Sequence, residues 1–405
     1  MKNTLNVGVI GLGGRGTHLL NLILDCFKEV NVVGVCDLYE DRARAGQDTV
    51  TAKRGNIPLC TTDYKKILSL PGLDAVVTPS AWEAHFDICV DAMNAGVYVA
   101  SEVGGAYSVE QCFELVRTYE RTKVPCMMLE NCCYGQRELT VLNMVKKGLF
   151  GEIIHCAGGY HHDLREEVAM GNINRHYRLN NYKNRCGELY PTHELGPIAK
   201  YLNINRGNRM VSLTSMASKA RGINEWIRSR KGESFENASF DFAEGDVVTT
   251  CIKCARGETI VLTHDTTLPR YYTRANYVQG TKGMWTAERD AVLLDGPEEK
   301  IVPISEFFAE YEHPLWKNYT PVGGHDGMDY LVFCAFFDAV KNGTQTPIDV
   351  YDFASWAVIT ALSEQSIAQG SAPVSIPDFT GGMWTHREPF VRSKYCLEEV
   401  CEEQF

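Results

Sequence analysis

The sequence lacks any hydrophobic run of the roughly 18 residues that a membrane-spanning helix needs. Only MKNTL precedes the first predicted strand, which leaves no room for the charged and hydrophobic regions of a secretory signal peptide. We therefore expect a cytoplasmic protein that makes no membrane contact. A leader already removed from the chain would leave no trace in this sequence.

Clusters of basic residues are also absent. The chain carries 40 Lys and Arg against 51 Asp and Glu, a formal net charge of -11. Nucleic acids and anionic membranes attract proteins with clustered positive charge, so neither is an expected partner. The sequence has no internal repeat, low-complexity tract or obvious linker. Its 405 residues exceed the usual size of one domain, which predicts two domains with separate cores.

Cysteine is plentiful, with fifteen residues spread over predicted strands and helices. A chain of this length needs no disulfides for stability, so we interpret them as mostly reduced, buried thiols. Cys251 and Cys254 form one CxxC motif within a predicted strand, where residues three apart point to opposite faces. This position favours a structural role over zinc or redox chemistry, and the adjacent Cys132 and Cys133 are likewise interpreted as packing residues.

Strand-like and helix-like segments alternate through the first 130 residues. The predicted strands are NVGVIG, VNVVGVCD, LDAVVT, VYVAS and VPCMML, and a predicted helix follows each of the first four, the first of them over residues 17–27. Such alternation is typical of right-handed βαβ units with a parallel sheet. We predict a doubly wound α/β domain over residues 1–130.

The pattern changes from residue 131 onward. After a predicted helix over residues 136–147 come strand-like runs, and VVTTCIKC with ETIVLTHD predicts an antiparallel hairpin. Residues 328–340 and 353–368 have hydrophobic residues at helical spacing. We predict that residues 131–405 form an α/β domain with a large, mostly antiparallel sheet. An open sheet needs cover for its outer face, so we expect a homo-oligomer.

A glycine-rich motif follows the first strand. Gly11, Gly13 and Gly16 form GxGxxG where a helix opens, with Gly14 and Arg15 inside the loop, and Asp37 ends the next strand. The glycines allow a pyrophosphate to approach the backbone at a helix N-terminus. A carboxylate at the Asp37 position accepts hydrogen bonds from ribose hydroxyls and repels a 2'-phosphate, so we predict NAD over NADP. The alternative is a glycine-rich turn without a ligand.

Other residues around the dinucleotide should follow the carboxyl ends of neighbouring strands, where ligands of such sheets bind. Glu102 follows one of these strands in VYVASEVGGAY, a stretch with no Lys or His to move a proton. Hydride transfer from an alcohol also needs an acid or base, so we expect that group in the second half. The predicted cofactor contacts from these strand ends are Pro79, Trp82, His85, Glu102, Glu130 and Asn131.

Four clusters of aromatic and polar residues lie in the second half: GGYHHDLR, GELYPTHELGPIAKY, HDTTLPRYYTR and GGHDGMDY. Tyr190 and His193 are three residues apart and would share a face on a helical turn, ahead of a helix expected to begin near Pro197. A single histidine there is as readily a capping or core residue. His161 and His162 should face opposite sides of a strand, and no HExxH spacing occurs, so we expect no metal site. The clusters favour a polyhydroxylated substrate.

These residues resemble the glucose-fructose oxidoreductase, inositol dehydrogenase and MocA superfamily over nearly the whole chain. The segments LENCCYGQREL, YHHDLR, LYPTHELGP, NINRG, HDTTLPR, QGTKG and GGHDGMD are more similar to its NAD-dependent glycosidase branch, the α-N-acetylgalactosaminidase family (glycoside hydrolase family 109). The resemblance implies a Rossmann domain followed by a substrate domain. Dehydrogenases of the superfamily carry a catalytic lysine where this chain has Val103.

The resemblance implies a reaction with no net oxidation. Tightly bound NAD would take hydride from C3 of an amino or acetamido sugar, and the ketone would acidify the proton on C2. Elimination of the aglycone, addition of water and return of the hydride would complete hydrolysis. The paired carboxylates of ordinary glycosidases are then unnecessary.

The resemblance also implies the site residues. The catalytic set is Tyr160, Tyr190, His193 and Tyr272, with His193 handling the C3 hydroxyl proton and Tyr160 the first choice for the C2 proton. Glu130 would lie near the nicotinamide. Expected sugar contacts are Arg165, Asn181 and His325.

This chain departs from the branch at several positions. Gly104 stands where the branch has proline, and Glu194 and Asp326 stand where it has glycine; Trp and His are usual near Tyr177 and Asn181. Two added carboxylates near the sugar pocket would alter which amino or acetamido sugar fits. Two alternative functions remain at this point: an NAD-dependent sugar or inositol dehydrogenase, and a non-catalytic NAD-binding sensor.

Overall fold

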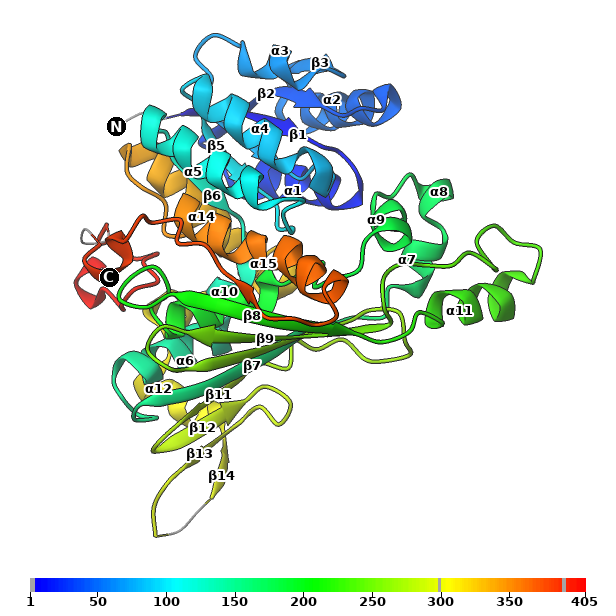
Figure 1. The fold of residues 1–405 in the computed structure, drawn as a ribbon. Coiled ribbons are helices and arrows are strands. Elements are labelled where there is room, and N and C mark those ends of the chain that lie inside the picture. The colour runs from blue at the N-terminus through cyan, green and yellow to red at the C-terminus, as the bar shows by residue number, and fades with distance from the viewer. Residues whose placement is uncertain (1–3, 298–299, 388–390) are drawn as a thin grey trace.

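The computed structural model describes residues 4–297, 300–387 and 391–405. Two sheets dominate it, and helices lie around the first sheet and between the two sheets (Figure 1). The chain completes the first sheet before it begins the second, in agreement with the change of pattern near residue 131.

The first sheet has six strands in the order β3-β2-β1-β4-β5-β6. Every described pairing in it is parallel, which confirms the predicted doubly wound α/β arrangement. The four residues of β4 are all buried, as expected for a strand covered by helices on both faces. The strands are β1 (Leu5–Ile10), β2 (Val30–Cys36), β3 (Leu59–Thr61), β4 (Ala75–Thr78), β5 (Tyr98–Ser101) and β6 (Cys126–Met128).

Five helices connect these strands: α1 (Gly14–Cys26), α2 (Glu40–Arg54), α3 (Tyr64–Leu68), α4 (Trp82–Asn94) and α5 (Val109–Thr122). The helix expected from residue 17 begins at Gly14, because part of the glycine motif already has helical geometry. No side chain caps this N-terminus, so its backbone N–H groups are available to an anion. By contrast, the Ser108 side chain caps α5.

The second sheet has nine strands in the order β14-β13-β12-β11-β7-β10-β9-β8-β15. Among the described pairings of this sheet, only that of β7 with β10 is parallel, so the predicted mostly antiparallel sheet is confirmed. The predicted hairpin is β9 with β10, in register from Thr259 opposite Lys253 to Asp265 opposite Val247. The strands are β7 (Ile153–His161), β8 (Met210–Ala217), β9 (Val247–Cys254), β10 (Thr259–Asp265), β11 (Tyr277–Gly280), β12 (Gly283–Thr286), β13 (Ala291–Leu294), β14 (Ile301–Pro303) and β15 (Val374–Ser375).

Helices of the second half position the site. The 3-10 helix η1 (Asn131–Tyr134) follows β6, and α10 (Thr192–Tyr201) packs against both η1 and β7. The helix expected near Pro197 therefore begins five residues earlier, with Pro197 inside it and His193 in its first turn. The remaining α-helices are α6 (Gln136–Lys146), α7 (Arg165–Ala169), α8 (Gly171–Asn174), α9 (Arg178–Asn184), α11 (Gly222–Lys231), α12 (Phe308–Tyr311), α13 (Pro314–Lys317), α14 (Met328–Asn342) and α15 (Val350–Ala368).

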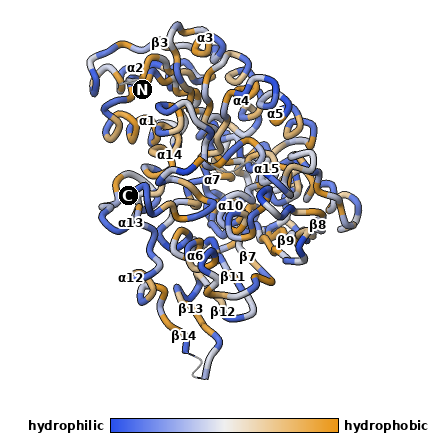
Figure 2. Tube along the Cα trace, turned by 90° about the vertical axis from the view of Figure 1, so that its left-hand side faces the viewer, coloured by the Kyte–Doolittle hydropathy of each residue, from blue (hydrophilic) through white to orange (hydrophobic). Residues whose placement is uncertain are grey.

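Helix α15 joins the two halves, because it packs on α5 and β6 on one side and on β8 on the other (Figure 1). A capping box at Asp349 and Asp352 fixes its start. Hydrophobic and hydrophilic residues are interspersed along most elements (Figure 2), and no helix within the described ranges is long and apolar enough to cross a membrane. The division of the chain at residues 130 and 131 remains a prediction.

Candidate active site

The glycine motif forms a close turn at the carboxyl end of β1. Gly11 has a φ of 107°, and a Cβ there would lie 2.6 Å from the backbone nitrogen of Ser80. A Cβ at Gly16 would lie 2.0 Å from the carbonyl oxygen of Gly11. Around Gly14 there is open space instead, with nothing within 4 Å of an added Cβ. Two glycines thus close the turn, while the middle of the loop leaves room for a pyrophosphate at the N-terminus of α1.

Asp37 lies directly after β2 and beside this loop. Its Oδ2 accepts a hydrogen bond from the Leu12 backbone N–H at 2.6 Å, and its Oδ1 accepts one from Tyr39 at 2.9 Å. Each carboxylate oxygen has a second lone pair. The backbone therefore holds the carboxylate at the edge where the adenosine ribose binds in folds of this kind, with capacity left for ribose hydroxyls.

Arg15 links the loop to residues far along the chain. Its guanidinium lies 2.8 Å from Glu102 and donates two hydrogen bonds to Asp329, at 2.6 and 2.9 Å. Asp329 is fully buried in the first turn of α14 and also accepts a hydrogen bond from Asn131 at 2.7 Å. Burial raises the pKa of Asp329, but the hydrogen bonds and charges of Arg15 and His325 outweigh it and leave that pKa far below its usual value. The sequence did not identify Asp329 as the centre of this network.

The other predicted cofactor residues lie at the same edge of the sheet. Pro79 contacts the glycine turn, and His85 is buried, with Nε2 3.0 Å from the Ser80 carbonyl oxygen. Burial lowers the pKa of His85 to about 4, so this imidazole is neutral. Gly104, unexplained by sequence, has a structural reason: a Cβ there would meet the Trp82 ring at 2.5 Å.

Four of the predicted residues come together in an aromatic cluster, which we define as Trp82, Tyr160, Tyr190 and His193. The Tyr160 and Tyr190 ring centroids are 4.5 Å apart, and His193 lies 5.0 Å from Tyr190 and 5.7 Å from Tyr160. The indole of Trp82 stacks on Tyr190 at 5.5 Å. Tyr272 stands at the rim, about half exposed and 6.5 Å from Tyr160. The cluster therefore joins the edge of the first sheet to the end of β7.

Arg178 is a member of this site that the sequence did not identify. Its guanidinium lies 5.1 Å from the Tyr190 ring centroid, 5.4 Å from Trp82 and 5.8 Å from Tyr160. Burial raises the pKa of Tyr160, whereas the neighbouring positive charge of Arg178 opposes that rise. Arg178 therefore stabilises negative charge on the Tyr160 oxygen. Only its place at the start of α9, beside Tyr177, could have suggested this role.

Glu130 and His193 form a buried pair beneath the cluster. Glu130 Oε1 lies 2.8 Å from His193 Nδ1, and it also accepts the Cys132 backbone N–H. Burial raises the pKa of Glu130, but His193 and the hydrogen bonds from Thr192 and Cys132 bring it below its usual value. An ionised Glu130 makes Nδ1 of His193 the hydrogen-bond donor, which leaves Nε2 free to accept a proton. The structure thus gives Glu130 a second partner besides the expected nicotinamide.

The predicted sugar contacts lie outside the cluster. Arg165 pairs with Asp163 at 2.6 Å, and Asn181 is buried and accepts a hydrogen bond from the Tyr107 hydroxyl at 2.6 Å. His325 lies 3.0 Å from Asp329, in the network around Arg15. Their assignment as substrate residues remains a prediction.

The two added carboxylates differ in burial. Asp326 is exposed, with a φ of 52°. Glu194 is fully buried and projects over Gly158 of β7, where a Cβ on that glycine would meet the Glu194 Cβ at 2.6 Å. Neither carboxyl oxygen of Glu194 has a hydrogen-bond partner among the described residues, and burial with the nearby Glu188 raises its pKa well above the usual value. Glu194 thus faces the second sheet.

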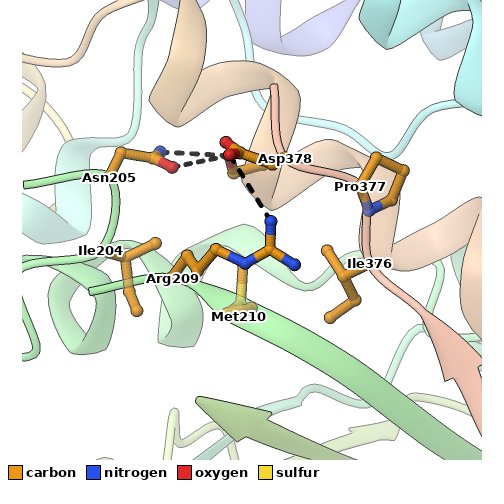
Figure 3. Close-up of a pocket in the computed structure, with 8 residues that line it drawn as sticks. Ile204, Asn205, Arg209, Met210, Ile376, Pro377 and Asp378 are labelled. Carbon is orange, nitrogen blue, oxygen red and sulfur yellow. Dashed lines mark hydrogen bonds and ion pairs between the residues drawn. The ribbon is translucent and has the colours of Figure 1, made fainter. Parts of the chain in front are cut away.

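Within the described ranges, one group of side chains brings metal-ligand atoms together: Glu130, Cys132 and His193 offer donors within 4.8 Å of one another. The short Glu130–His193 hydrogen bond already accounts for two of them. A small pocket lies elsewhere, where Arg209 reaches Asp378 near Asn205 (Figure 3). No residue of the aromatic cluster lines that pocket.

Comparison with known proteins identifies the family. Residues 134–386 match the model for the glycosyl hydrolase 109 C-terminal domain, and residues 5–130 match the oxidoreductase family with an NAD-binding Rossmann fold. The chain belongs to glycosyl hydrolase family 109. An α-N-acetylgalactosaminidase of Tannerella forsythia is 38% identical over 95% of this chain and 88% of its own length. An α-N-acetylgalactosaminidase of Shewanella oneidensis is also 38% identical, over 95% of this chain and 87% of its own length.

Solved structures agree on the fold of this family 109 glycosidase. Levoglucosan dehydrogenase in complex with NADH and levoglucosan superposes with a TM-score of 0.69 at 19% identity, covering 93% of this chain and all of the other. An inositol dehydrogenase homologue of Azotobacter vinelandii, complexed with NAD+, superposes with a TM-score of 0.69 at 16% identity, covering 92% of this chain and 97% of the other. These structures show the fold, and the match of residues 5–130 to the oxidoreductase family model confirms the expected superfamily resemblance.

Proposed function

We propose that this family 109 member is an α-N-acetylgalactosaminidase that uses tightly bound NAD without net oxidation of its substrate. The observation that carries the proposal is the Glu130–His193 pair beside Tyr160, at the edge of the dinucleotide-binding sheet. Relatives at 38% identity bear that enzyme's name. A second support is the absence of a dehydrogenase lysine, since the corresponding Val103 is buried and aliphatic.

The residues at the loop fit a dinucleotide. Open space around Gly14, the uncapped start of α1 and Asp37 at the end of β2 would hold the pyrophosphate and the adenosine ribose. Arg15 and Glu102 would contact the phosphates and the nicotinamide ribose. NAD, when bound, supplies a hydride acceptor for C3 of the sugar and later the donor that restores it.

His193 and Glu130 handle the first proton. Because Glu130 fixes the orientation of His193, the free Nε2 takes the proton of the C3 hydroxyl as that carbon is oxidised. Glu130 stabilises the imidazolium that results, in a buried setting where such an interaction is strong. When the ketone is reduced again, His193 returns the proton.

Tyr160 handles the second proton. The ketone at C3 makes the C2 proton acidic, and the oxygen of Tyr160 removes it. Arg178 stabilises the negative charge that this oxygen gains as it gives up its own proton. Tyr190 stays protonated, because burial raises its pKa well above the usual value. It therefore serves as a hydrogen-bond donor to the sugar. Tyr272, at the exposed rim, is placed to contact the aglycone side.

A panel of α- and β-linked nitrophenyl glycosides tests this proposal, with NAD added and both the released phenol and NADH absorbance recorded. The proposal predicts release from the α-linked N-acetylgalactosaminide without lasting NADH. A sugar dehydrogenase would accumulate NADH in proportion to substrate, and an NAD sensor would bind the cofactor and turn over no glycoside.

A further inference from the structure

The Tyr160 hydroxyl has a hydrogen-bond partner in His162, besides the neighbouring guanidinium of Arg178. The phenol oxygen lies 3.0 Å from Nδ1 of His162, two residues further along the chain. The two rings meet edge to face at 5.7 Å. In the tautomer that carries its proton on Nε2, His162 accepts the phenol proton at Nδ1.

His162 also connects the buried site with its rim. Tyr160 is 5% exposed, whereas His162 is partly exposed and its ring lies 5.0 Å from the rim residue Tyr272. Its backbone N–H donates to the Asp265 carbonyl oxygen, which fixes its position just after β7. A buried phenol therefore has a titratable group between it and solvent.

We infer that His162 is a further catalytic residue, the proton relay that exchanges the proton of Tyr160 with solvent during cleavage at C2. This inference rests on the proposed function, because it needs Tyr160 to act on C2. A buried tyrosine that keeps the C2 proton would return it to the carbon it came from. A relay lets the site lose that proton and complete elimination.

Each step balances. As the C2–H bond breaks, its electron pair forms the enolate of the C3 ketone and the proton goes to the Tyr160 oxygen. The proton that Tyr160 already held passes to Nδ1 of His162, which becomes an imidazolium and releases its Nε2 proton to water. The enolate then expels the aglycone as the C1–O bond breaks, and the aglycone oxygen takes a proton from water. Reversal of the transfers through Tyr160 and His162 supplies a proton to C2 when water adds at C1. No oxidant or reductant is consumed in these steps.

The electrostatic setting of His162 keeps its ring neutral between proton transfers. Burial and the positive charge of Arg178 lower the pKa of His162, so the ring is neutral and ready to accept a proton near pH 7. The negative charges of Glu167 and Asp163 oppose that lowering and would stabilise the imidazolium when it forms. The titratable or charged groups that face His162 are Tyr160, Asp163, Glu167, Arg178, His193 and Tyr272.

The test compares His162→Asn with His161→Asn in NAD-loaded enzyme. Asparagine retains a polar atom near the Nδ1 position but cannot carry a proton. His161 is a matched control, because it lies next door on β7 but folds back toward Gly159, away from Tyr160. Deuterium at C2 of the sugar, formed in deuterated water, is measured per turnover by NMR. Kinetic isotope effects with C2- and C3-deuterated substrate are measured in parallel across pH.

We expect His162→Asn to slow deuterium entry and turnover by about a hundredfold to ten-thousandfold, the usual range for a proton-transfer group. The C2 isotope effect should rise, and the pH limb due to His162 should disappear, with His161→Asn unchanged. Normal deuterium entry in folded His162→Asn overturns the relay and leaves the proposed function intact. Absence of C2 deuterium in wild type overturns the relay, and absence of an isotope effect from C2-deuterated substrate as well overturns the proposed function. Should His162→Asn fail to fold, His162→Gln replaces it in the same assays.

Discussion

Replacing Glu130 by glutamine tests the catalytic pair most sharply. The variant keeps an oxygen near Nδ1 of His193, 2.8 Å away in the wild type, but removes the charge. Hydrogen bonds to charged groups are worth about 1.5–3 kcal/mol. Since each 1.36 kcal/mol is tenfold in rate, C3 oxidation should slow about tenfold to 150-fold. The rate of C3 oxidation should fall because His193 becomes an imidazolium during that step.

Single-turnover stopped-flow measurement of NADH formation gives the rate of this step directly. The exposed Glu152→Gln serves as a control for the chemical change alone. Thermal unfolding and NAD binding verify that the variant folds and holds its cofactor. A folded, NAD-loaded Glu130→Gln that forms NADH at the wild-type rate would refute the role of the pair.

Three further outcomes are expected. Because the pKa of Glu194 is raised in the folded state, the protein loses stability as the pH rises above the pKa of Glu194 in the unfolded chain. Glu194→Gln should therefore raise the free energy of unfolding more at pH 8 than at pH 5 in urea titrations. Zinc should inhibit by capturing the donors of Glu130, Cys132 and His193, and Cys132→Ser should weaken that inhibition in dose-response assays. Asp329→Asn should weaken NAD binding about tenfold by calorimetry, because Arg15 loses a charged partner; unchanged affinity would contradict the role of that network.

Much of the fold could be predicted from local patterns. The GxGxxG motif with Asp37 and the alternation of strands and helices led to the parallel sheet, and the β9–β10 hairpin followed from two adjacent strand-like runs. Helix starts were less accurate. Pro197 suggested a boundary, yet α10 begins at Thr192 because packing of this helix against β7 and η1 outweighs the local preference.

The site was only partly predictable because contacts between distant segments position some of its residues. Tyr190 and His193 are close in sequence, and their rings are 5.0 Å apart. Arg178 and Asp329 reach the site through contacts between distant segments, Asp329 by its hydrogen bonds to Arg15, 314 residues away. Glu194 lies against Gly158 of β7, a contact between distant segments, and its expected place near the sugar stays a prediction. Local sequence patterns carry no information on such contacts between distant segments.

The expected homo-oligomer can be tested directly in solution. The outer face of the second sheet bears Thr214, Cys251 and Lys253 of β8 and β9 around a shallow hollow. Size-exclusion chromatography with light scattering would report the mass in solution. A dimer or larger assembly is expected, and a monomer at micromolar concentration would contradict that expectation.

The central claim is that hydrolysis proceeds through a transient ketone and loss of the C2 proton. The most direct measurement is NMR of N-acetylgalactosamine released by the NAD-loaded enzyme in deuterated water. The account predicts deuterium at C2 and protium at C3, because the hydride at C3 returns to its own carbon. Product with protium at C2, together with no isotope effect from C2-deuterated substrate, would contradict it.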